Sequence, residues 1–187
     1  MKKYSLIIFG CQMNIADGEK IVSVLKDLDY KKASKMEDAD LIIVVACSVR
    51  QSAVDRIFGL IPKFKKIKAK TILTGCVLDF DKKKLEGKFD YILDIKDLNN
   101  WYKILSKEDL CYPKDYLNIY PERQINFIAS IPISGGCENF CTYCAVPYTR
   151  GPLKCRDHRE IIKEVEKVVL DGAKEIWLLG QNVNDYE

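Results

Sequence analysis

Three cysteines within eight residues form the most specific chemical pattern in the chain. Cys137, Cys141 and Cys144 have the spacing C-x3-C-x2-C and follow directly on Gly135 and Gly136. Cysteine thiolates are the usual ligands of iron–sulfur clusters, and glycines let a backbone approach a bulky group because they carry no Cβ. The stretch offers three ligands, so one iron of a cubane cluster would stay open to bind another molecule. The spacing therefore predicts an iron–sulfur cluster with one open iron.

Two alternative uses of these cysteines stay open at this stage. A structural zinc site would take Cys155 or His158 as its fourth ligand, but zinc sites usually combine two C-x2-C or C…H pairs. The second alternative is a disulfide. It is disfavoured because a chain of 187 residues can bury a core without cross-links. The N-terminal apolar run is also expected to be a strand and not a secretion signal.

A second group of cysteines is spread along the first half of the chain. Cys11, Cys47 and Cys76 each follow a short apolar run that is typical of a buried strand. Parallel strands end at one edge of a sheet, where open α/β sheets place their ligands, so these three thiols are expected to meet there. They would hold a second iron–sulfur cluster, or they are buried cysteines that act as small apolar residues. We interpret Cys111 and Cys155 as ordinary thiols.

The elements that would position these cysteines alternate between short apolar strands and amphipathic helices. Strands are expected at residues 5–10, 41–46, 71–74 and 91–95, with helices at 17–28, from about residue 52, and after residue 97. Asn14 or Asp17 is the expected cap of the first helix, and Asp97 that of the third. The alternation predicts an α/β fold, with an open parallel, flavodoxin-like sheet and helices on both of its faces.

The chain divides into an N-terminal domain of residues 1–106, a linker of residues 107–126, and the start of a second domain at residues 127–187. The linker is predicted because residues 107–126 lose the helix and strand periodicity and contain Pro113 and Pro121.

The second domain begins with a strand at residues 127–133 that leads into the cysteine loop. Asp157 is expected to cap a helix that ends before Gly172, and residues 175–179 form the next strand. Two βα units cannot close a TIM-like barrel, and the last strand would be an uncovered edge. We therefore expect a truncated partial barrel that belongs to a longer protein.

The charge of the chain is mildly basic, with 30 Lys and Arg against 27 Asp and Glu and a net charge of +3. This balance permits an RNA partner without requiring one. The lysine groups at residues 63–70 and 82–84 are interpreted as solvated helix ends. No apolar run approaches the length of a membrane span, so we expect a cytoplasmic protein without a membrane partner.

Several motifs together resemble the radical SAM methylthiotransferases, enzymes that use S-adenosylmethionine (SAM). The motifs are Gly10-Cys-Gln-Met-Asn14, Cys47-Ser-Val-Arg50, Gly75-Cys76, the stretch Gly136–Gly151, and Leu178-Leu-Gly-Gln-Asn-Val-Asn-Asp-Tyr186. Gly-Gln-Asn-Val-Asn favours the branch that acts on dimethylallyladenosine beside the anticodon of tRNA. The chain departs from the family pattern at Val45-Ala46, where Asn-Thr is usual, and at Cys155-Arg156, where Ser-Arg is frequent. Neither departure removes a predicted cluster ligand.

The resemblance implies two 4Fe–4S clusters, one on each group of three cysteines, and two uses of SAM. One SAM would methylate a sulfur atom at the second cluster. The other would bind the open iron of the first cluster and be cleaved to a radical that removes a hydrogen from carbon 2 of the adenine. Tyr143 and Arg150 are the expected SAM-binding residues. Their alternatives are that Tyr143 only lines the loop and that Arg150 makes a structural ion pair.

The resemblance also implies partners. These are a tRNA substrate and an electron donor such as flavodoxin or ferredoxin, with a monomeric enzyme. Alternative substrates are threonylcarbamoyladenosine in tRNA or a ribosomal protein. The alternative from a different class is a non-catalytic metal-binding module for nucleic acid, which would explain the cysteines and lysines but not two separate groups of three thiols.

Overall fold

The computed structural model describes residues 1–106, 110–123 and 127–187. Its larger part is a five-stranded parallel sheet with the strand order β2-β1-β3-β4-β5. The strands are β1 (Lys3–Ile8), β2 (Lys31–Lys32), β3 (Leu41–Cys47), β4 (Lys70–Cys76) and β5 (Tyr91–Ile92). The predicted open parallel α/β sheet is confirmed.

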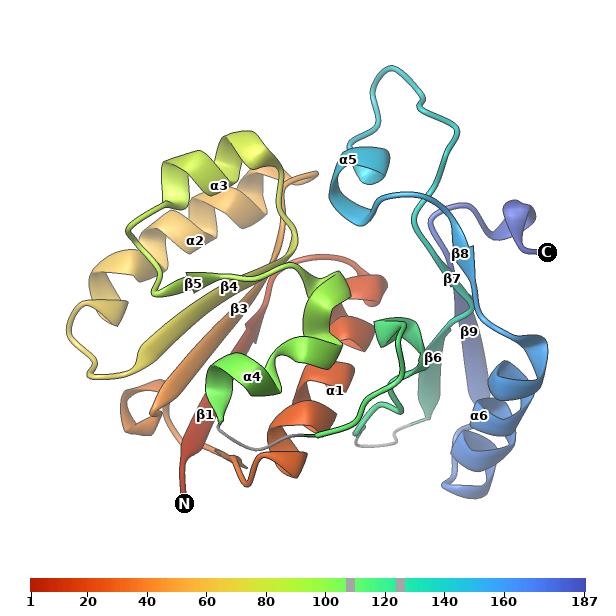
Figure 1. Cartoon of the computed structure of the whole chain (residues 1–187), viewed down its shortest axis with the longest axis horizontal. Coiled ribbons are helices and arrows are strands. Elements are labelled where there is room, and N and C mark those ends of the chain that lie inside the picture. The colour runs from red at the N-terminus through yellow and green to blue at the C-terminus, as the bar shows by residue number, and fades with distance from the viewer. Residues whose placement is uncertain (107–109, 124–126) are drawn as a thin grey trace.

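Helices cover both faces of this sheet (Figure 1). One face carries α1 (Gln12–Asp27), the 3₁₀ helix η2 (Ile95–Asn100) and α4 (Tyr102–Leu105), and the other carries α2 (Gln51–Phe64), α3 (Asp79–Leu85) and the short η1 (Met36–Asp38). All seven residues of the central strand β3 are buried. Alternate side chains of a strand point to opposite faces, so Ile43 packs in the core under α1 while Ile42 and Val44 pack in the core under α2.

Two predicted helix caps are wrong. The first helix begins at Gln12 with Cys11 as its cap, so Asn14 and Asp17 lie inside the helix, and both are fully buried. Asn14 is instead the third residue of the helix, and its Oδ1 accepts the backbone N–H of Cys11 at 3.3 Å. Asp97 does not cap either, because η2 begins earlier and Asp94 accepts the backbone N–H of Lys96 at 2.9 Å.

Some elements had no signal strong enough to predict them. Strand β2 is two lysines that pair with Lys3 and Tyr4 of β1, and a pair of exposed charged residues gives no apolar pattern. Helix α3 is short and carries three consecutive lysines. Strand β5 is shorter than the predicted run, because the backbone turns into η2 at Ile95.

The described part of the predicted linker packs against the first domain. Tyr116 and Leu117, in the 3₁₀ helix η3 (Tyr116–Asn118), and Ile119 are buried in the core under α1. The ammonium group of Lys20, a fully buried residue of α1, donates hydrogen bonds to the carbonyl oxygens of Leu117 (2.8 Å) and Ile119 (2.7 Å). The domain boundaries at residues 106 and 127 stay a prediction.

The second unit is a βαβ arrangement that lies beside the first sheet (Figure 1). Strand β6 (Ile128–Pro132) pairs in parallel with β9 (Glu175–Leu179), and α6 (His158–Leu170) packs on β6. As predicted, Asp157 caps α6 by accepting the backbone N–H of Arg159 at 2.7 Å. Gly172 follows the helix end with φ of +109°, a conformation that favours glycine.

The cysteine loop leaves and re-enters this unit through a short antiparallel pair, β7 (Ser134–Gly135) and β8 (Lys154–Cys155). Between them, α5 (Val146–Arg150) packs against the end of β4 in the first domain. The 3₁₀ helix η4 (Val183–Asp185) follows β9. The cysteine loop is therefore in contact with the carboxyl end of the first sheet.

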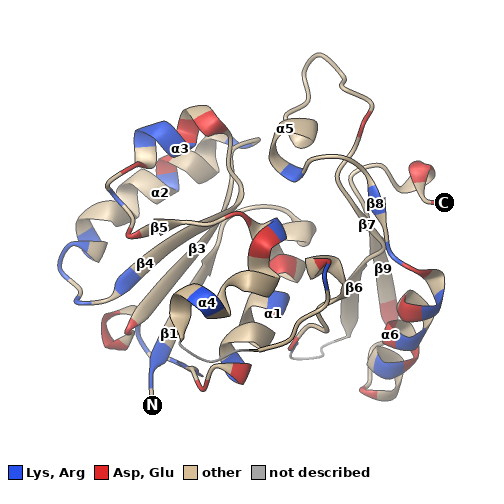
Figure 2. Cartoon of the chain, viewed as in Figure 1, with Lys and Arg blue, Asp and Glu red and all other residues tan. Residues whose placement is uncertain are grey.

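Charged residues lie mainly on the helices and loops, with both signs interspersed (Figure 2). On α3, Lys82 pairs with Asp79 at 2.9 Å and the Lys84 ammonium lies 3.9 Å from Asp81, as on a solvated helix. No helix within the described residues is long and apolar enough to cross a membrane.

Candidate functional site

The three cysteines of the first domain, here called the sheet-edge cysteines, lie at the carboxyl edge of the sheet. Cys47 and Cys76 are the last residues of β3 and β4 and are aligned Cα partners. Cys11 lies just past β1, and the Phe9 N–H donates to the Val45 carbonyl (2.8 Å), which extends the β1–β3 pairing toward the same edge. Cys47 and Cys76 are buried, whereas Cys11 is exposed.

The side-chain amide of Asn14 connects two of these cysteines. Its Oδ1 lies 3.3 Å from the Cys11 sulfur, and its Nδ2 lies 3.9 Å from the Cys76 sulfur. The same Nδ2 donates to the Ala46 carbonyl oxygen at 3.1 Å, which ties α1 to the end of β3. Because Asn14 is fully buried, this amide fixes the position of the first turn of α1 relative to both strand ends.

Gly75 allows the close approach of β3 and Asn14 to its own backbone, directly before Cys76. Its φ is +101°, and an added Cβ would lie 2.4 Å from the Ala46 carbonyl oxygen. A side chain at this position would displace the neighbouring strand. The Gly-Cys order at the end of β4 is therefore a requirement of the geometry of the sheet edge.

The loop cysteines, Cys137, Cys141 and Cys144, differ in exposure. Cys137 is buried, Cys144 is partly buried and Cys141 is exposed. Gly136 precedes them with φ of +82°, and a Cβ there would lie 2.0 Å from the Pro152 carbonyl oxygen, so the predicted need for glycine is confirmed at this position.

The start of the loop is held by the segment that follows β9. The Gly136 N–H donates to the Gln181 side-chain oxygen at 2.6 Å, and Asn139 donates to the Asp185 carboxylate at 3.1 Å. The Cys137 N–H donates to the Gly151 carbonyl oxygen at 3.1 Å, which closes the base of the loop. The Gly-Gln-Asn motif that carried part of the resemblance therefore supports the cysteine loop directly.

Tyr143 is 89% exposed between two loop cysteines. The nearby Cys141 charge and a hydrogen bond with that thiol raise the pKa of Tyr143 above its usual value. An exposed aromatic ring beside the loop is available to stack on a planar group. Contact of this ring with SAM stays a prediction.

Arg150 is buried, with 4% of its surface exposed, and its guanidinium reaches the first domain. Nη2 donates to the Asp17 carboxylate at 2.6 Å, Nη1 to the Tyr116 hydroxyl at 3.1 Å, and Nε to the Cys76 sulfur at 2.9 Å. The structural ion pair considered as an alternative is thus present. Binding of a cofactor by Arg150 stays a prediction, and the contact with a sheet-edge sulfur is an addition to it.

Burial and the neighbouring charges shift the pKa values of Cys76 and Arg150 in opposite directions. Burial raises the pKa of the Cys76 thiol, while the positive charge of Arg150 acts to lower it. Burial alone would lower the pKa of Arg150, but the Asp17 charge and the nearby Tyr116 and Cys76 groups hold it well above its usual value. Burial, followed by the Asp17 charge, raises the pKa of Tyr116. Arg150 is therefore a permanent cation beside Cys76.

The residues at both cysteine groups fit an iron–sulfur cluster. All eight cysteines lie among the described residues, and all are free thiols. At the sheet edge, a buried cation faces a buried sulfur, which suits an anionic thiolate ligand. At the loop, the three thiols are of the residue type that ligates iron, and their exposure ranges from buried to exposed. Cluster ligation by either group stays a prediction.

The structure does not assemble a single-ion site. No three His, Cys, Asp or Glu side chains of residues 1–106, 110–123 and 127–187 come together closely enough to hold one metal ion. Cys155, one of the two residues that the zinc alternative would use as a fourth ligand, lies on β8 with its sulfur 3.9 Å from the Asp185 carbonyl oxygen. His158, the other candidate, begins α6 and lies beside Asp157.

Sequence reasoning missed the roles of Asp17, Tyr116 and Gln181. Asp17 and Arg150 are separated by 133 positions, so no local pattern could link them. A usable signal was the acidic side chain on the apolar face of α1, since a buried carboxylate needs a cationic partner.

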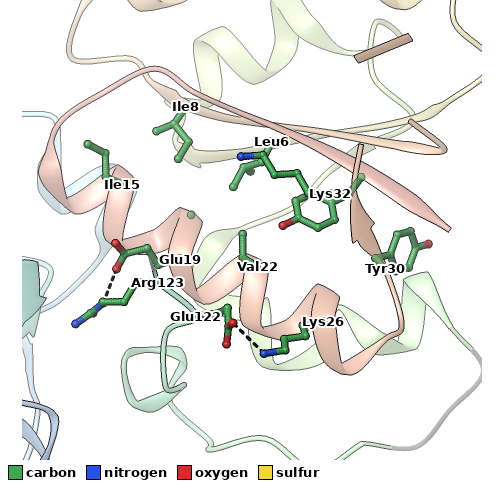
Figure 3. Close-up of a pocket in the computed structure, with 12 residues that line it drawn as sticks. Leu6, Ile8, Ile15, Glu19, Val22, Lys26, Tyr30, Lys32, Glu122 and Arg123 are labelled. Atoms are coloured by element: carbon green, nitrogen blue, oxygen red, sulfur yellow. Dashed lines mark hydrogen bonds and ion pairs between the residues drawn. The ribbon is translucent and has the colours of Figure 1, made fainter. Parts of the chain in front are cut away.

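A cavity of about 470 Å³ lies along β1 and α1 (Figure 3). Apolar side chains such as Leu6, Ile8 and Val22 line it, together with the ion pairs Glu19–Arg123 and Lys26–Glu122, each 2.9 Å long. None of the cysteines lines this cavity. It therefore belongs to the packing of α1 on the sheet and not to the candidate site.

Comparison with known proteins places these two parts in known families. Residues 3–95 match the uncharacterized protein family UPF0004, and residues 131–187 match the radical SAM superfamily. The chain is 40% identical to the tRNA-2-methylthio-N(6)-dimethylallyladenosine synthase of Dictyoglomus thermophilum, over 100% of this chain and 46% of that protein. It is 36% identical to the synthase of the same name from Fusobacterium nucleatum, over 100% of this chain and 47% of that protein.

The βα unit with the C-x3-C-x2-C loop is the part that matches the radical SAM superfamily, and this superfamily implies SAM and an iron–sulfur cluster. The two family matches occur in the same chain order as the two structural units, and the relatives share one name. The chain is therefore similar to the radical SAM methylthiotransferases in both of its parts. It spans about half the length of the curated relatives that it matches.

Proposed function

We propose that the protein is a tRNA methylthiotransferase, which adds a methylthio group to carbon 2 of N6-dimethylallyladenosine beside the anticodon. The observation that carries this proposal is the contact between an arginine of the cysteine loop and a sheet-edge cysteine. Arg150, which lies six positions after the last loop cysteine, reaches the sulfur of a sheet-edge cysteine at 2.9 Å. A transfer that needs both a sulfur source and SAM requires two such sites side by side.

In this proposal, Cys137, Cys141 and Cys144 hold one 4Fe–4S cluster, and the sheet-edge cysteines hold a second. When bound, the first cluster supplies an open iron and an electron for SAM, and the second supplies a site for the transferred sulfur. A C–H bond on an aromatic ring carbon offers no useful handle for a general acid or base, so radical chemistry suits this substrate.

The side chains of this chain supply position and shielding. Gln181 and Asn139 hold the cysteine loop, and Asn14 holds the strand ends in register with α1. The exposed ring of Tyr143 is proposed to pack on the adenine of SAM. Each cysteine group has one exposed member, Cys11 at the sheet edge and Cys141 in the loop, and we propose that the substrate approaches at these residues.

The partners of this proposal are a tRNA, a flavodoxin or ferredoxin as electron donor, and no second copy of the chain. Because its substrate is tRNA, we place the protein in the cytoplasm. Size-exclusion chromatography with light scattering tests the monomer, and reduction by photoreduced flavodoxin tests the donor.

The test of the proposal is anaerobic reconstitution with iron and sulfide, followed by incubation with SAM, reductant and tRNA that carries dimethylallyladenosine. We expect 5′-deoxyadenosine and a methylthio-modified nucleoside by mass spectrometry. Replacement of the three loop cysteines by alanine should abolish both products. Modification of threonylcarbamoyladenosine in place of dimethylallyladenosine would show that the alternative tRNA nucleoside is the substrate. Absence of 5′-deoxyadenosine would contradict the proposal.

A further inference from the structure

We propose that Arg150 is a positioning residue for the sheet-edge cluster, and that it holds the Cys76 sulfur and sets the reduction potential of that cluster. The inference rests on the proposed function, because it takes the sheet-edge cysteines as cluster ligands. It concerns a residue of the cysteine loop that acts on the other cysteine group.

The three donor positions of the Arg150 guanidinium serve three different partners. Ion pairs between arginine and a carboxylate frequently form two parallel hydrogen bonds. Here Nη2 alone binds Asp17 at 2.6 Å, and the second carboxylate oxygen of Asp17 has no hydrogen-bond partner among the described residues. Nε is directed at the Cys76 sulfur at 2.9 Å. The geometry is that of an arginine shared between a carboxylate and a sulfur.

Burial makes this contact electrostatically strong. Arg150, Asp17 and Cys76 are all buried, so water does not screen their charges. A cation and an N–H donor beside a ligating sulfur stabilise the reduced form of an iron–sulfur cluster, because the added electron is delocalised onto the sulfur ligands. Loss of Arg150 should therefore lower the reduction potential, and loss of the Asp17 charge should raise it.

The contact also connects the two cysteine groups mechanically. Arg150 ends α5, whose first residue lies two positions after Cys144, and α5 packs against the end of β4. The hydroxyl of Tyr116, from the segment between the domains, accepts a hydrogen bond from Nη1 of Arg150 at 3.1 Å and completes the partner set. A displacement of the cysteine loop would therefore move the donor away from the Cys76 sulfur.

The experiment uses the chain with Cys137, Cys141 and Cys144 replaced by alanine, so that only the sheet-edge cluster gives a signal. The potential is measured by a redox titration monitored by electron paramagnetic resonance. We expect Arg150→Met to shift the potential downward, Asp17→Asn to shift it upward, and Arg150→Lys to shift it downward by less than Arg150→Met. Potential shifts of opposite sign in Arg150→Met and Asp17→Asn cannot arise from a general loss of packing.

Arg156→Lys is the matched control. Arg156 is also a buried arginine in an ion pair, with Glu164 at 2.7 Å, and its other partners are the Pro132 carbonyl (2.7 Å) and Asn118 (3.4 Å). We expect this variant to leave the potential and the resonance spectrum unchanged, even if its melting temperature falls. If Arg150→Met does not fold, the directions of the potential shifts in Arg150→Lys and Asp17→Asn still test the proposal.

The failures of the two proposals are distinguishable. No iron at the sheet edge in the background protein would overturn the proposed cluster and with it the proposed function. Iron that binds normally, with equal potentials in the Arg150→Lys, Asp17→Asn and background proteins, would overturn only the role of Arg150. Equal shifts in Arg150→Lys and Arg156→Lys would also overturn it, because the effect would then not depend on contact with the sulfur.

Discussion

Cys47 and Cys76 are aligned partners at the final paired positions of β3 and β4, so their side chains leave two neighbouring strands at the same level. Neighbouring strands lie about 4.8 Å apart. Two thiols in this relation can contact one bulky cluster without any change in the backbone of either strand. The first prediction concerns how much iron this edge and the loop each hold.

Replacement of Cys137, Cys141 and Cys144 by alanine should remove about half of the iron that the chain binds on anaerobic reconstitution, because the sheet-edge group keeps its three thiols. Iron and sulfide analysis measures this. The exposed cysteines Cys111 and Cys155 provide the control, since their replacement by alanine should leave the iron content unchanged. Full retention or complete loss of iron in the triple variant would contradict two separate sites.

Gly75→Ala should destabilise the fold by about 1–3 kcal/mol or more, because φ of +101° and the Ala46 carbonyl oxygen leave no room for a Cβ. Urea unfolding measures the change. Gly59 is the matched control, since a Cβ at this position of α2 meets no atom within 4 Å. Gly59→Ala should stabilise by up to about 1 kcal/mol. Equal effects of the two substitutions would show that the sheet edge does not need glycine.

Lys20→Met should change how stability depends on pH. Burial lowers the pKa of Lys20 to about 8, whereas its ordinary pKa is near 10.5. Between these two pH values Lys20 is therefore protonated in the unfolded chain and largely neutral in the folded chain. Stability of the wild-type chain should therefore rise with pH in this window by comparison with Lys20→Met. The charges that surround this ammonium group are those of Glu164, Arg156, Asp17 and Arg123.

The measurement is urea unfolding at several pH values, with the difference between the two proteins taken at each pH. This difference removes the contribution of tyrosines such as Tyr112 and Tyr116, whose raised pKa values lower stability above pH 10 in both proteins. Lys26→Met is the control, because Lys26 is exposed and pairs with Glu122. A constant difference across the window would disprove the assignment for Lys20.

Gln181→Leu should weaken iron binding at the loop cysteines and leave the sheet-edge iron in place. The side-chain oxygen of Gln181 accepts the Gly136 N–H at 2.6 Å and fixes the start of the loop. Gln181→Glu keeps an oxygen acceptor at this position and should retain more iron than Gln181→Leu. The comparison uses the rate of iron release to a chelator. Identical release rates in the two variants would show that this hydrogen bond does not hold the loop.

The positions of the sheet-edge cysteines could be predicted because the rule that governs them is local. An apolar run that ends in Gly-Cys or Ala-Cys indicates a strand with a thiol at its carboxyl end. The carboxyl ends of parallel strands lie at the same edge of the sheet. The glycine at position 136 could be predicted for a similar reason, since a turn just before a ligand loop favours positive φ.

The partners of Arg150 could not be predicted, because they come from distant parts of the chain. Asp17 lies in α1 and Tyr116 lies in the segment between the domains. The preference of Asn and Asp for helix caps predicts Asn14 or Asp17 in that role, but tertiary contacts at the sheet edge decide the positions of both residues. Cys11 gave no signal as a cap, since cysteine is not among the preferred capping residues.

The two short strands that end the first sheet have a consequence for solubility. On one side the sheet closes with the exposed lysines Lys31 and Lys32 of β2, and charged, short edge strands discourage pairing with another chain. Replacement of both lysines by valine should therefore favour strand addition by a second chain at β2.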